Sequence, residues 1–160
     1  MTDRPKTGRS AIHATFVVER VYAASPARVF SAFADPEQKA KWFHGPEEWG
    51  PPESGMDFRV GGEDYAVSRP PGEPPHHFRS RYHDIVPDER IVYTYWMHHG
   101  DNLASVSVST IEIRPEGPKT RLVITEVGVF LDGYYSPEGR EDGTRQLMEQ
   151  IAPLVEGTTP

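Results

Sequence analysis

The chain has 160 residues, a formal net charge of -7 and no cysteine. Its length predicts one domain with a sizeable core, and its 36% hydrophobic content excludes wholesale disorder. The acidic balance argues against nucleic-acid binding, which needs a concentrated basic face. Without cysteine, disulfides and thiolate chemistry are excluded. No apolar run approaches the roughly 20 residues of a membrane span, and we expect a cytoplasmic location.

The first third of the chain predicts a flexible tail, one strand and two short helices. Residues 1–10 are polar, and residues 11–23 alternate between apolar and polar positions as a half-buried strand does. One face of that strand carries Phe16, Val18, Arg20 and Tyr22. The pairs Ser25-Pro26 and Asp35-Pro36 are typical of an N-cap followed by the first helical turn.

The middle of the chain predicts a series of antiparallel strands. Residues 56–60 and 63–67 flank Gly61-Gly62, which favours a short hairpin. After a proline-rich connection, longer strands are expected over residues 78–86, 90–98, 104–114 and 120–130. The turns between these four are too short for parallel crossovers, so neighbouring strands must be antiparallel. In the third of them the apolar positions change phase between Val108 and Ile111, which predicts a β-bulge.

Residues 136–155 predict one long C-terminal helix that begins at Ser136-Pro137. Its apolar stripe, at steps of three and four, consists of Thr144, Leu147, Met148, Ile151, Leu154 and Val155. Because one face of an antiparallel sheet needs cover, we expect an α+β fold in which a curved sheet of about seven strands wraps around this helix. The domain would span residues 11–156, with tails at 1–10 and 157–160.

Several stretches resemble the domain of activators of the heat-shock-protein-90 ATPase, which belongs to the START and birch-pollen-allergen-like helix-grip superfamily (SRPBCC). They are residues 16–22, 25–30, 35–37, 41–43, 84–94 and 119–122, together with Glu126. The resemblance implies a helix-grip fold that binds a hydrophobic small molecule between sheet and helix. The family's last helix usually opens with Gly-Trp, whereas this chain has Gly143-Thr144, a difference that implies more room at one end of the cavity.

Glu126 is the most informative polar residue in the predicted sheet. It is in phase with Leu122 and Ile124, so alternation places it on the inner face. A buried carboxylate is costly unless it is paired. Glu126 is therefore either an acid of raised pKa, a contact for a polar ligand group, an ion-pair partner of Arg20, or a residue at a wet rim.

Residues 90–98 carry aromatic side chains on both faces, and we favour Ile91, Tyr93, Tyr95 and Met97 as the inner set. Such a set suits either an apolar pocket or plain core packing. The candidate ligand-binding residues are Tyr93, Tyr95, Met97, Glu126, Phe130, Thr144, Arg20 and Trp42. No metal site is predicted, because in His76-His77 and His98-His99 adjacent side chains on extended backbone point to opposite sides.

We expect the chain to bind a hydrophobic or aromatic small molecule and to require no cofactor. Two alternatives stay open. One is an enzyme such as a polyketide cyclase or hydrolase with Glu126 as a weak catalytic candidate. The other is a module that contacts a chaperone. A homodimer formed through a sheet edge is a further open option.

Overall fold

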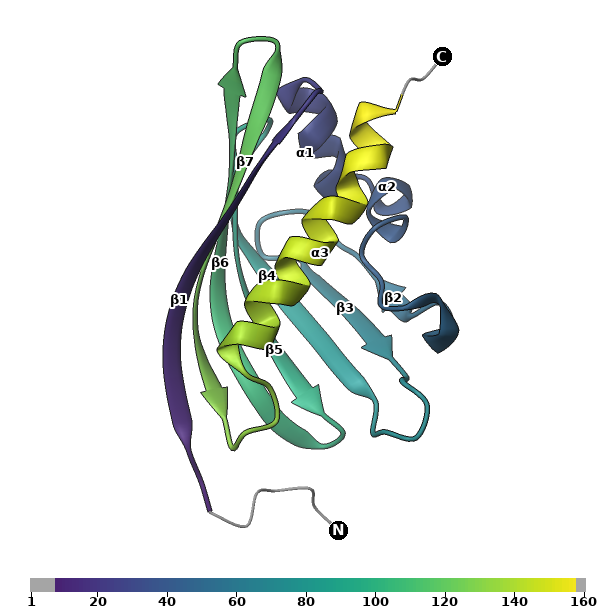
Figure 1. The fold of residues 1–160 in the computed structure, drawn as a ribbon, viewed down its shortest axis with the longest axis vertical. Coiled ribbons are helices and arrows are strands. Elements are labelled where there is room, and N and C mark those ends of the chain that lie inside the picture. The colour runs from purple at the N-terminus through teal and green to yellow at the C-terminus, as the bar shows by residue number, and fades with distance from the viewer. Residues whose placement is uncertain (1–7, 158–160) are drawn as a thin grey trace.

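The computed structural model describes residues 8–157 as one seven-stranded antiparallel sheet, three α-helices and a short 3-10 helix (Figure 1). The strands are β1 (Ala11–Tyr22), β2 (Glu53–Gly55), β3 (Glu63–Ser68), β4 (His76–Val86), β5 (Arg90–His99), β6 (Asn102–Glu116) and β7 (Lys119–Leu131). The helices are α1 (Pro26–Ala34), α2 (Pro36–Ala40), η1 (Glu47–Trp49) and α3 (Pro137–Glu156). The strand order β1-β7-β6-β5-β4-β3-β2 places the first strand beside the last. The predicted α+β helix-grip architecture is confirmed.

All three α-helices begin where the sequence predicts. The side chains of Ser25, Asp35 and Ser136 each accept a hydrogen bond from a backbone N–H two or three residues further on. A proline follows each cap, where its missing N–H removes no helical bond. These starts depend on neighbouring residues alone, which is why local sequence identifies them.

The predicted hairpin over residues 56–67 is wrong in its first half. Residues 57–62 form a compact turn in which the N–H of Gly62 donates to the carbonyl of Arg59. The N–H of Gly61 donates instead to Tyr82 of β4. Strand β3 pairs with β4 on one side and, on the other, with β2, which lies earlier in the chain and has Glu53 opposite Val67.

The bulge predicted within β6 is also wrong in position. From Ser105 to Glu112 the register against β5 is continuous, and the shift lies earlier, at Ala104. Val106 and Val108 lie on the outer face, where they are 40% and 44% exposed. The inner face carries Ser105, Ser107 and Ser109, which are all buried. The apolar positions therefore change phase because the interior is polar there, and the strand keeps its alternation.

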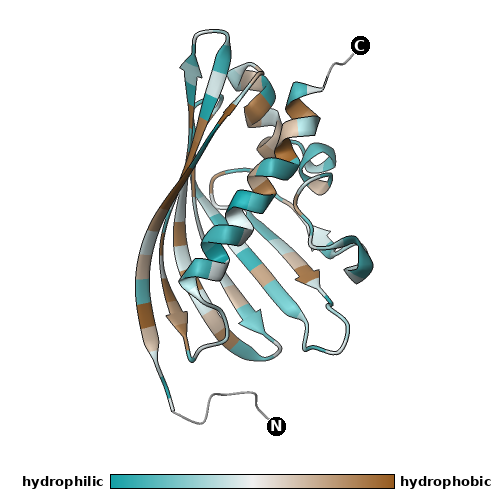
Figure 2. Cartoon of the chain, viewed as in Figure 1, coloured by the Kyte–Doolittle hydropathy of each residue, from teal (hydrophilic) through white to brown (hydrophobic). Residues whose placement is uncertain are grey.

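Helix α3 crosses the inner face of the sheet and differs between its two halves (Figure 2). Its buried residues, Met148, Ile151, Ala152 and Val155, all lie in the second half. That half packs on the main core with α1 and β1, and the Tyr22 hydroxyl donates to the carbonyl of Met148 at 2.7 Å. The first half lies over the other end of the sheet and contributes no residue to the core.

The residues just before β1 contact the turn that follows β7. The backbone N–H of Ser10 donates to Asp132 at 3.0 Å, and Arg9 forms an ion pair with the same carboxylate. The remainder of the predicted tails, residues 1–7 and 158–160, lies outside the described residues. Within residues 8–157, no helix combines the length and the apolar character that crossing a membrane requires.

Candidate functional site

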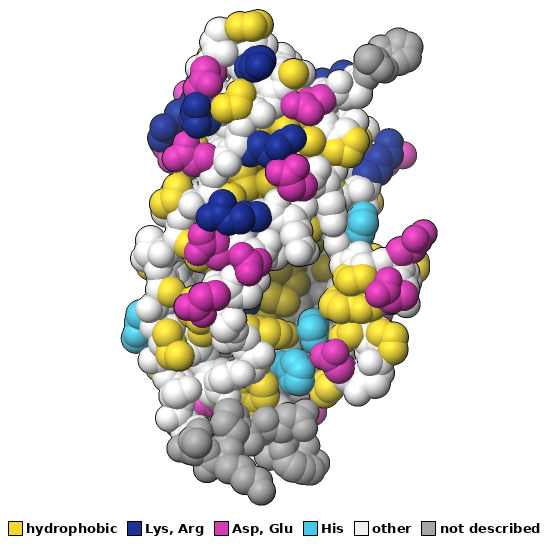
Figure 3. Space-filling view, viewed as in Figure 1, with side chains coloured by type: hydrophobic (Ala, Val, Ile, Leu, Met, Phe, Trp, Pro, Cys, Tyr) yellow, Lys and Arg dark blue, Asp and Glu magenta, His cyan; other side chains and the backbone are white. Residues whose placement is uncertain are grey.

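A cavity of about 810 Å³ lies between α3 and the inner face of the sheet, and both halves of the helix contribute lining residues. Figure 3 shows its opening between α3 and the segment that carries η1, with hydrophobic side chains inside. Small-molecule sites in proteins typically have volumes of roughly 300–1,000 Å³. The cavity exists because the first half of α3 has small residues toward the sheet: Gly143 lines it, and a Cβ built there would meet nothing within 4 Å.

Eleven aromatic rings contribute to the cavity wall. They come from α1, from the segment around η1, from the turn between β2 and β3, from strands β4 and β5, and from the turn before α3. They are Phe33, Trp42, Phe43, Trp49, Phe58, Phe78, Tyr82, Tyr93, Tyr95, Tyr134 and Tyr135. Phe78 connects two groups of rings, with its centroid 5.1 Å from that of Phe43 and 5.2 Å from that of Tyr95. Such contacts hold the wall in a defined shape.

Glu126 of β7 is buried at the inner face and receives hydrogen bonds on both carboxylate oxygens. The Tyr95 hydroxyl lies 2.6 and 2.7 Å from Oε1 and Oε2, and the Ser107 hydroxyl donates to Oε2 at 2.7 Å. Arg140 of α3 completes the arrangement, with its Nη1 3.2 Å from Oε2. We call Glu126, Tyr95, Ser105, Ser107 and Arg140 the Glu126 cluster.

Arg140 connects α3 to the sheet. Its guanidinium donates to Tyr95 and, through Nη2, to the Ser105 hydroxyl, each at 2.8 Å. The same group lies over the rings of Phe130, Tyr95 and Tyr135. Burial by itself would lower the pKa of Arg140, but Tyr95 and Glu126 outweigh it and raise that pKa. Burial raises the pKa of the Tyr95 phenol well above its ordinary value. The cluster therefore holds the Arg140 cation beside a neutral Tyr95 phenol.

Gly128 allows the Ser107 hydroxyl to reach Glu126. It lies opposite Ser107 in the β6–β7 pairing, and a Cβ at this position would come under 3.0 Å from the Ser107 hydroxyl oxygen. Glycine is thus required by close approach and not by an unusual backbone conformation.

A second polar group lies on the same cavity wall. Lys39 of α2 forms an ion pair with Asp64 of β3 at 3.1 Å, and the Tyr82 hydroxyl donates to the same carboxylate oxygen. The side chains of Lys39 and Asp64 are 16% and 5% exposed. Burial lowers the pKa of Lys39, although Asp64 partly opposes that shift. Of these three residues, Lys39 and Tyr82 line the cavity.

The structure places six of the eight candidate ligand-binding residues in the cavity lining: Tyr93, Tyr95, Met97, Glu126, Thr144 and Trp42. Phe130 is not among the lining residues; it is 1% exposed and lies under Arg140. The Trp42 indole N–H donates to the carbonyl of Ala32 at 2.7 Å, which fixes the ring in the wall.

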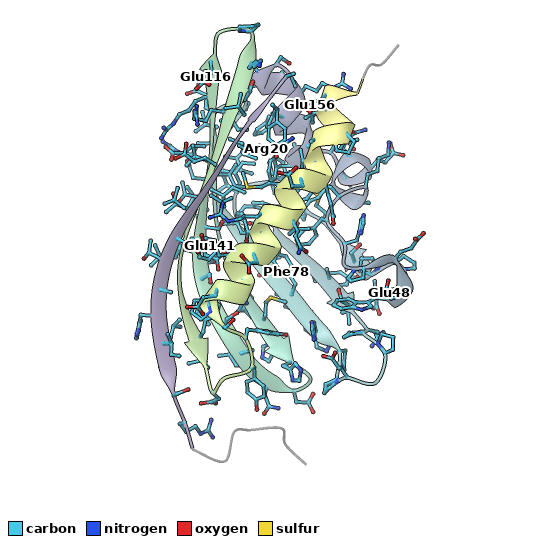
Figure 4. All side chains as sticks on the ribbon, in the orientation of Figure 1. Arg20, Glu48, Phe78, Glu116, Glu141 and Glu156 are labelled. Carbon is cyan, nitrogen blue, oxygen red and sulfur yellow. The ribbon has the colours of Figure 1, made fainter. Side chains whose placement is uncertain are left out.

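Arg20 is not the partner of Glu126. It forms an ion pair with Glu149 at 3.0 Å and approaches Glu156 at 4.0 Å, both in the second half of α3 (Figure 4). Sequence reasoning missed the true partner, Arg140. The sequence does contain an indication of it, because Arg140 lies one helical turn before Thr144 and so shares the predicted inner face of the C-terminal helix. Lys39 and Asp64 carried no comparable signal.

A curved antiparallel sheet that holds a long C-terminal helix across its inner face, with a cavity between them, defines a helix-grip protein. The chain belongs to the family described as Activator of Hsp90 ATPase homolog 1-like protein, whose profile matches residues 23–156. Proteins with this fold commonly bind hydrophobic ligands. No curated protein is significantly similar to the chain.

Solved bacterial structures share both fold and sequence with this chain. Protein Mll3558 from Rhizobium loti is 44% identical, with a TM-score of 0.82 over 89% of this chain and 97% of its own. A protein from Rhizobium leguminosarum is 39% identical, with a TM-score of 0.88 over 94% and 99%. Protein CV1439 from Chromobacterium violaceum is 34% identical, with a TM-score of 0.76 over 90% and 99%.

Proposed function

We propose that this protein binds a hydrophobic or aromatic small molecule in the cavity between α3 and the sheet. The observation that carries the proposal is the aromatic-walled cavity of about 810 Å³. The polar groups that hydrogen bonds and ion pairs fix in this wall include the Glu126 cluster and the Lys39–Asp64 pair. A mostly apolar wall with a few fixed polar groups is typical of small-molecule sites, because apolar area supplies affinity and polar groups fix orientation.

The contacts of Glu126 favour binding over catalysis by this residue. A general base needs a lone pair that can reach the substrate proton. Both oxygens of Glu126 already accept hydrogen bonds, and Arg140 neutralises the charge. The cluster therefore supports a rigid wall with a tyrosine hydroxyl at its surface. The enzymatic alternative requires that Glu126→Gln abolish a turnover while leaving the fold intact.

Binding is tested by titrating the protein with fatty acids, aromatic polyketides and a naphthalene-sulfonate dye. Trp42 and Trp49 line the cavity, so intrinsic fluorescence reports an occupant directly. A ligand that binds only the folded state also raises the melting temperature, by an amount equivalent to about 2.7 kcal/mol at a hundredfold excess over Kd.

Position 143 provides a matched pair of variants for that titration. Gly143→Ala adds one methyl group into open space and should retain binding, whereas Gly143→Trp should occupy the cavity and abolish it. The proposal fails if no compound changes either signal. It also fails if both variants bind every compound as the wild type does.

A contact with a chaperone is a second candidate function, which the family description suggests. The outer face of the sheet is the surface that could make such a contact. Val106, Val108 and Val127 are 40%, 44% and 52% exposed there. Exposed apolar side chains on neighbouring strands can mark a protein contact. If purified host chaperone neither binds the protein nor hydrolyses ATP faster in its presence, this candidate is excluded.

A further inference from the structure

One histidine from each adjacent pair faces the same side of the sheet. In the β4–β5 pairing His76 lies opposite His99, and His77 lies opposite His98. Residues directly opposite on neighbouring strands share a face, so His76 and His99 lie together on the inner face. Their ring centroids are 5.4 Å apart. Within each pair of sequence neighbours the two side chains point to opposite faces of the sheet. The β4–β5 register nevertheless brings His76 of one pair beside His99 of the other.

Glu73, in the connection before β4, contributes a carboxylate to the same place. Its Oε1 lies 3.7 Å from Nε2 of His76. One ligand atom each from Glu73, His76 and His99 form a group in which all three atoms lie within 4.8 Å of one another. Among the described residues this is the only group of three or more histidine and acidic side chains with such spacing.

Several buried polar atoms in and beside this cluster have no hydrogen-bond partner. Five buried side-chain polar atoms in residues 8–157 have no hydrogen-bond partner, and four of them belong here. They are Nε2 of His76, Nδ1 of His99 and the hydroxyl oxygens of Tyr134 and Tyr135. The tyrosine rings lie against the histidines, with Tyr134 stacked on His99 at 5.3 Å. Buried polar atoms are nearly always satisfied, so four in one place indicate that something else binds them.

We propose that Glu73, His76 and His99 bind a divalent transition-metal ion of the zinc class. Two imidazoles and one carboxylate are ligands that such ions favour. Ligand atoms around a tetrahedral zinc ion are about 3.3 Å apart, so the present spacing must shorten by at most about 1.5 Å. Rotation of Glu73, whose side chain is 54% exposed, allows such an adjustment.

The site lies at the edge of the cavity. His76, Tyr134 and Tyr135 all line the cavity, and Figure 3 shows histidine side chains beside the opening. Three protein ligands leave one position of a tetrahedral ion for water or for a donor atom of another molecule. A metal ion held here would add a Lewis-acidic contact to the aromatic part of the cavity wall.

The proposal is tested with zinc and cobalt(II) ions and the full chain purified without a histidine tag. Calorimetry should show one zinc ion bound per chain, and cobalt absorption should report its coordination. His76→Ala and His99→Ala should each weaken zinc binding by more than about tenfold. His77→Ala and His98→Ala are the matched controls and should leave it unchanged, because they face the other side of the sheet.

Glu73→Gln provides a second test in case a histidine variant does not fold, since the exposed Glu73 side chain contributes little to stability. It should weaken zinc binding while leaving the circular dichroism spectrum unchanged. Absence of zinc binding by the wild type overturns the proposal. Equal losses in His76→Ala and His77→Ala also overturn it, since they indicate adventitious surface binding. No organic ligand is present in these measurements, so their outcome is independent of the small-molecule proposal.

Discussion

The ion pair between Glu126 and Arg140 allows the energetics of the cavity wall to be measured by a double-mutant cycle. Glu126→Gln keeps the side-chain shape and removes the charge. The two side chains are 4% and 12% exposed, so the change leaves a guanidinium in the interior without its anion. Removing one partner of a buried ion pair costs about 3–5 kcal/mol, because the other charge remains desolvated. We expect a loss of that size from Glu126→Gln and a similar loss from Arg140→Met.

The double variant should lose much less than the sum of the two single losses, because no charge remains buried. We expect a coupling free energy of at least about 1.5 kcal/mol. The free energies of unfolding are measured by guanidinium denaturation followed by circular dichroism, with a constant m-value as the check on two-state behaviour. For a chain of this length each kcal/mol shifts the melting temperature by about 2–4 °C, so each single variant should melt roughly 6–20 °C lower.

Arg145 provides the control on the same helix. It forms an ion pair with Glu141 in which the two side chains are 53% and 33% exposed. Arg145→Met should therefore cost no more than about 0.5 kcal/mol. Additivity of the Glu126 and Arg140 variants within about 0.5 kcal/mol would refute the reasoning. So would single losses as small as the loss from Arg145→Met.

Three further predictions concern individual groups. Gly128→Ala should destabilise the fold by about 1–3 kcal/mol in denaturation, since its Cβ would displace the Ser107 hydroxyl from Glu126; an unchanged midpoint would contradict the close approach. Tyr22→Phe should cost about 1 kcal/mol, measured in the same way, because the bond to α3 is lost; no loss would mean that this bond does not hold the helix. Stability should fall as pH rises from 10 to 12, because burial raises the pKa of Tyr93 to about 12 while the unfolded phenol ionises near 10. Above pH 10 the unfolded state then binds fewer protons than the folded state, and Tyr93 alone lowers the free energy of unfolding by up to about 3 kcal/mol. The measurement is the free energy of unfolding as a function of pH. If Tyr93→Phe leaves this pH profile unchanged, the prediction is wrong.

Sequence reasoning succeeded where the physical cause is local. The N-caps at Ser25, Asp35 and Ser136 act over two or three residues, so short motifs identify them. The alternation of β7 is likewise local, and it placed Glu126 on the inner face, where it is 3% exposed. Short turns required antiparallel neighbours, and the observed sheet is antiparallel throughout.

The polar interior could not be predicted in this way, because its causes are distant in the chain. Lys39 and Asp64 are 25 positions apart and meet only after α2 docks on β3. The inward position of the β6 serines was not predicted, because hydrophobicity indicates the phase of a strand only when its inner face is apolar. The two histidine pairs needed the β4–β5 register, which the turn between the strands fixes and composition does not. In each case the missing information is which strands or helices are neighbours.

The difference between the two halves of α3 explains how a helix can cover a sheet and still leave a cavity beneath it. The second half is held by buried apolar side chains such as Met148 and Ile151, which pack into the main core. If the first half were held in the same way, its side chains would occupy the cavity. Arg140 instead reaches the sheet with one long side chain, and Gly143 leaves the adjacent space open. A buried ion pair adds little net stability compared with apolar packing, but its directional bonds fix a position. The Glu126 cluster therefore holds the helix at a defined distance from the sheet, which a ligand-binding cavity requires and a well-packed core would prevent.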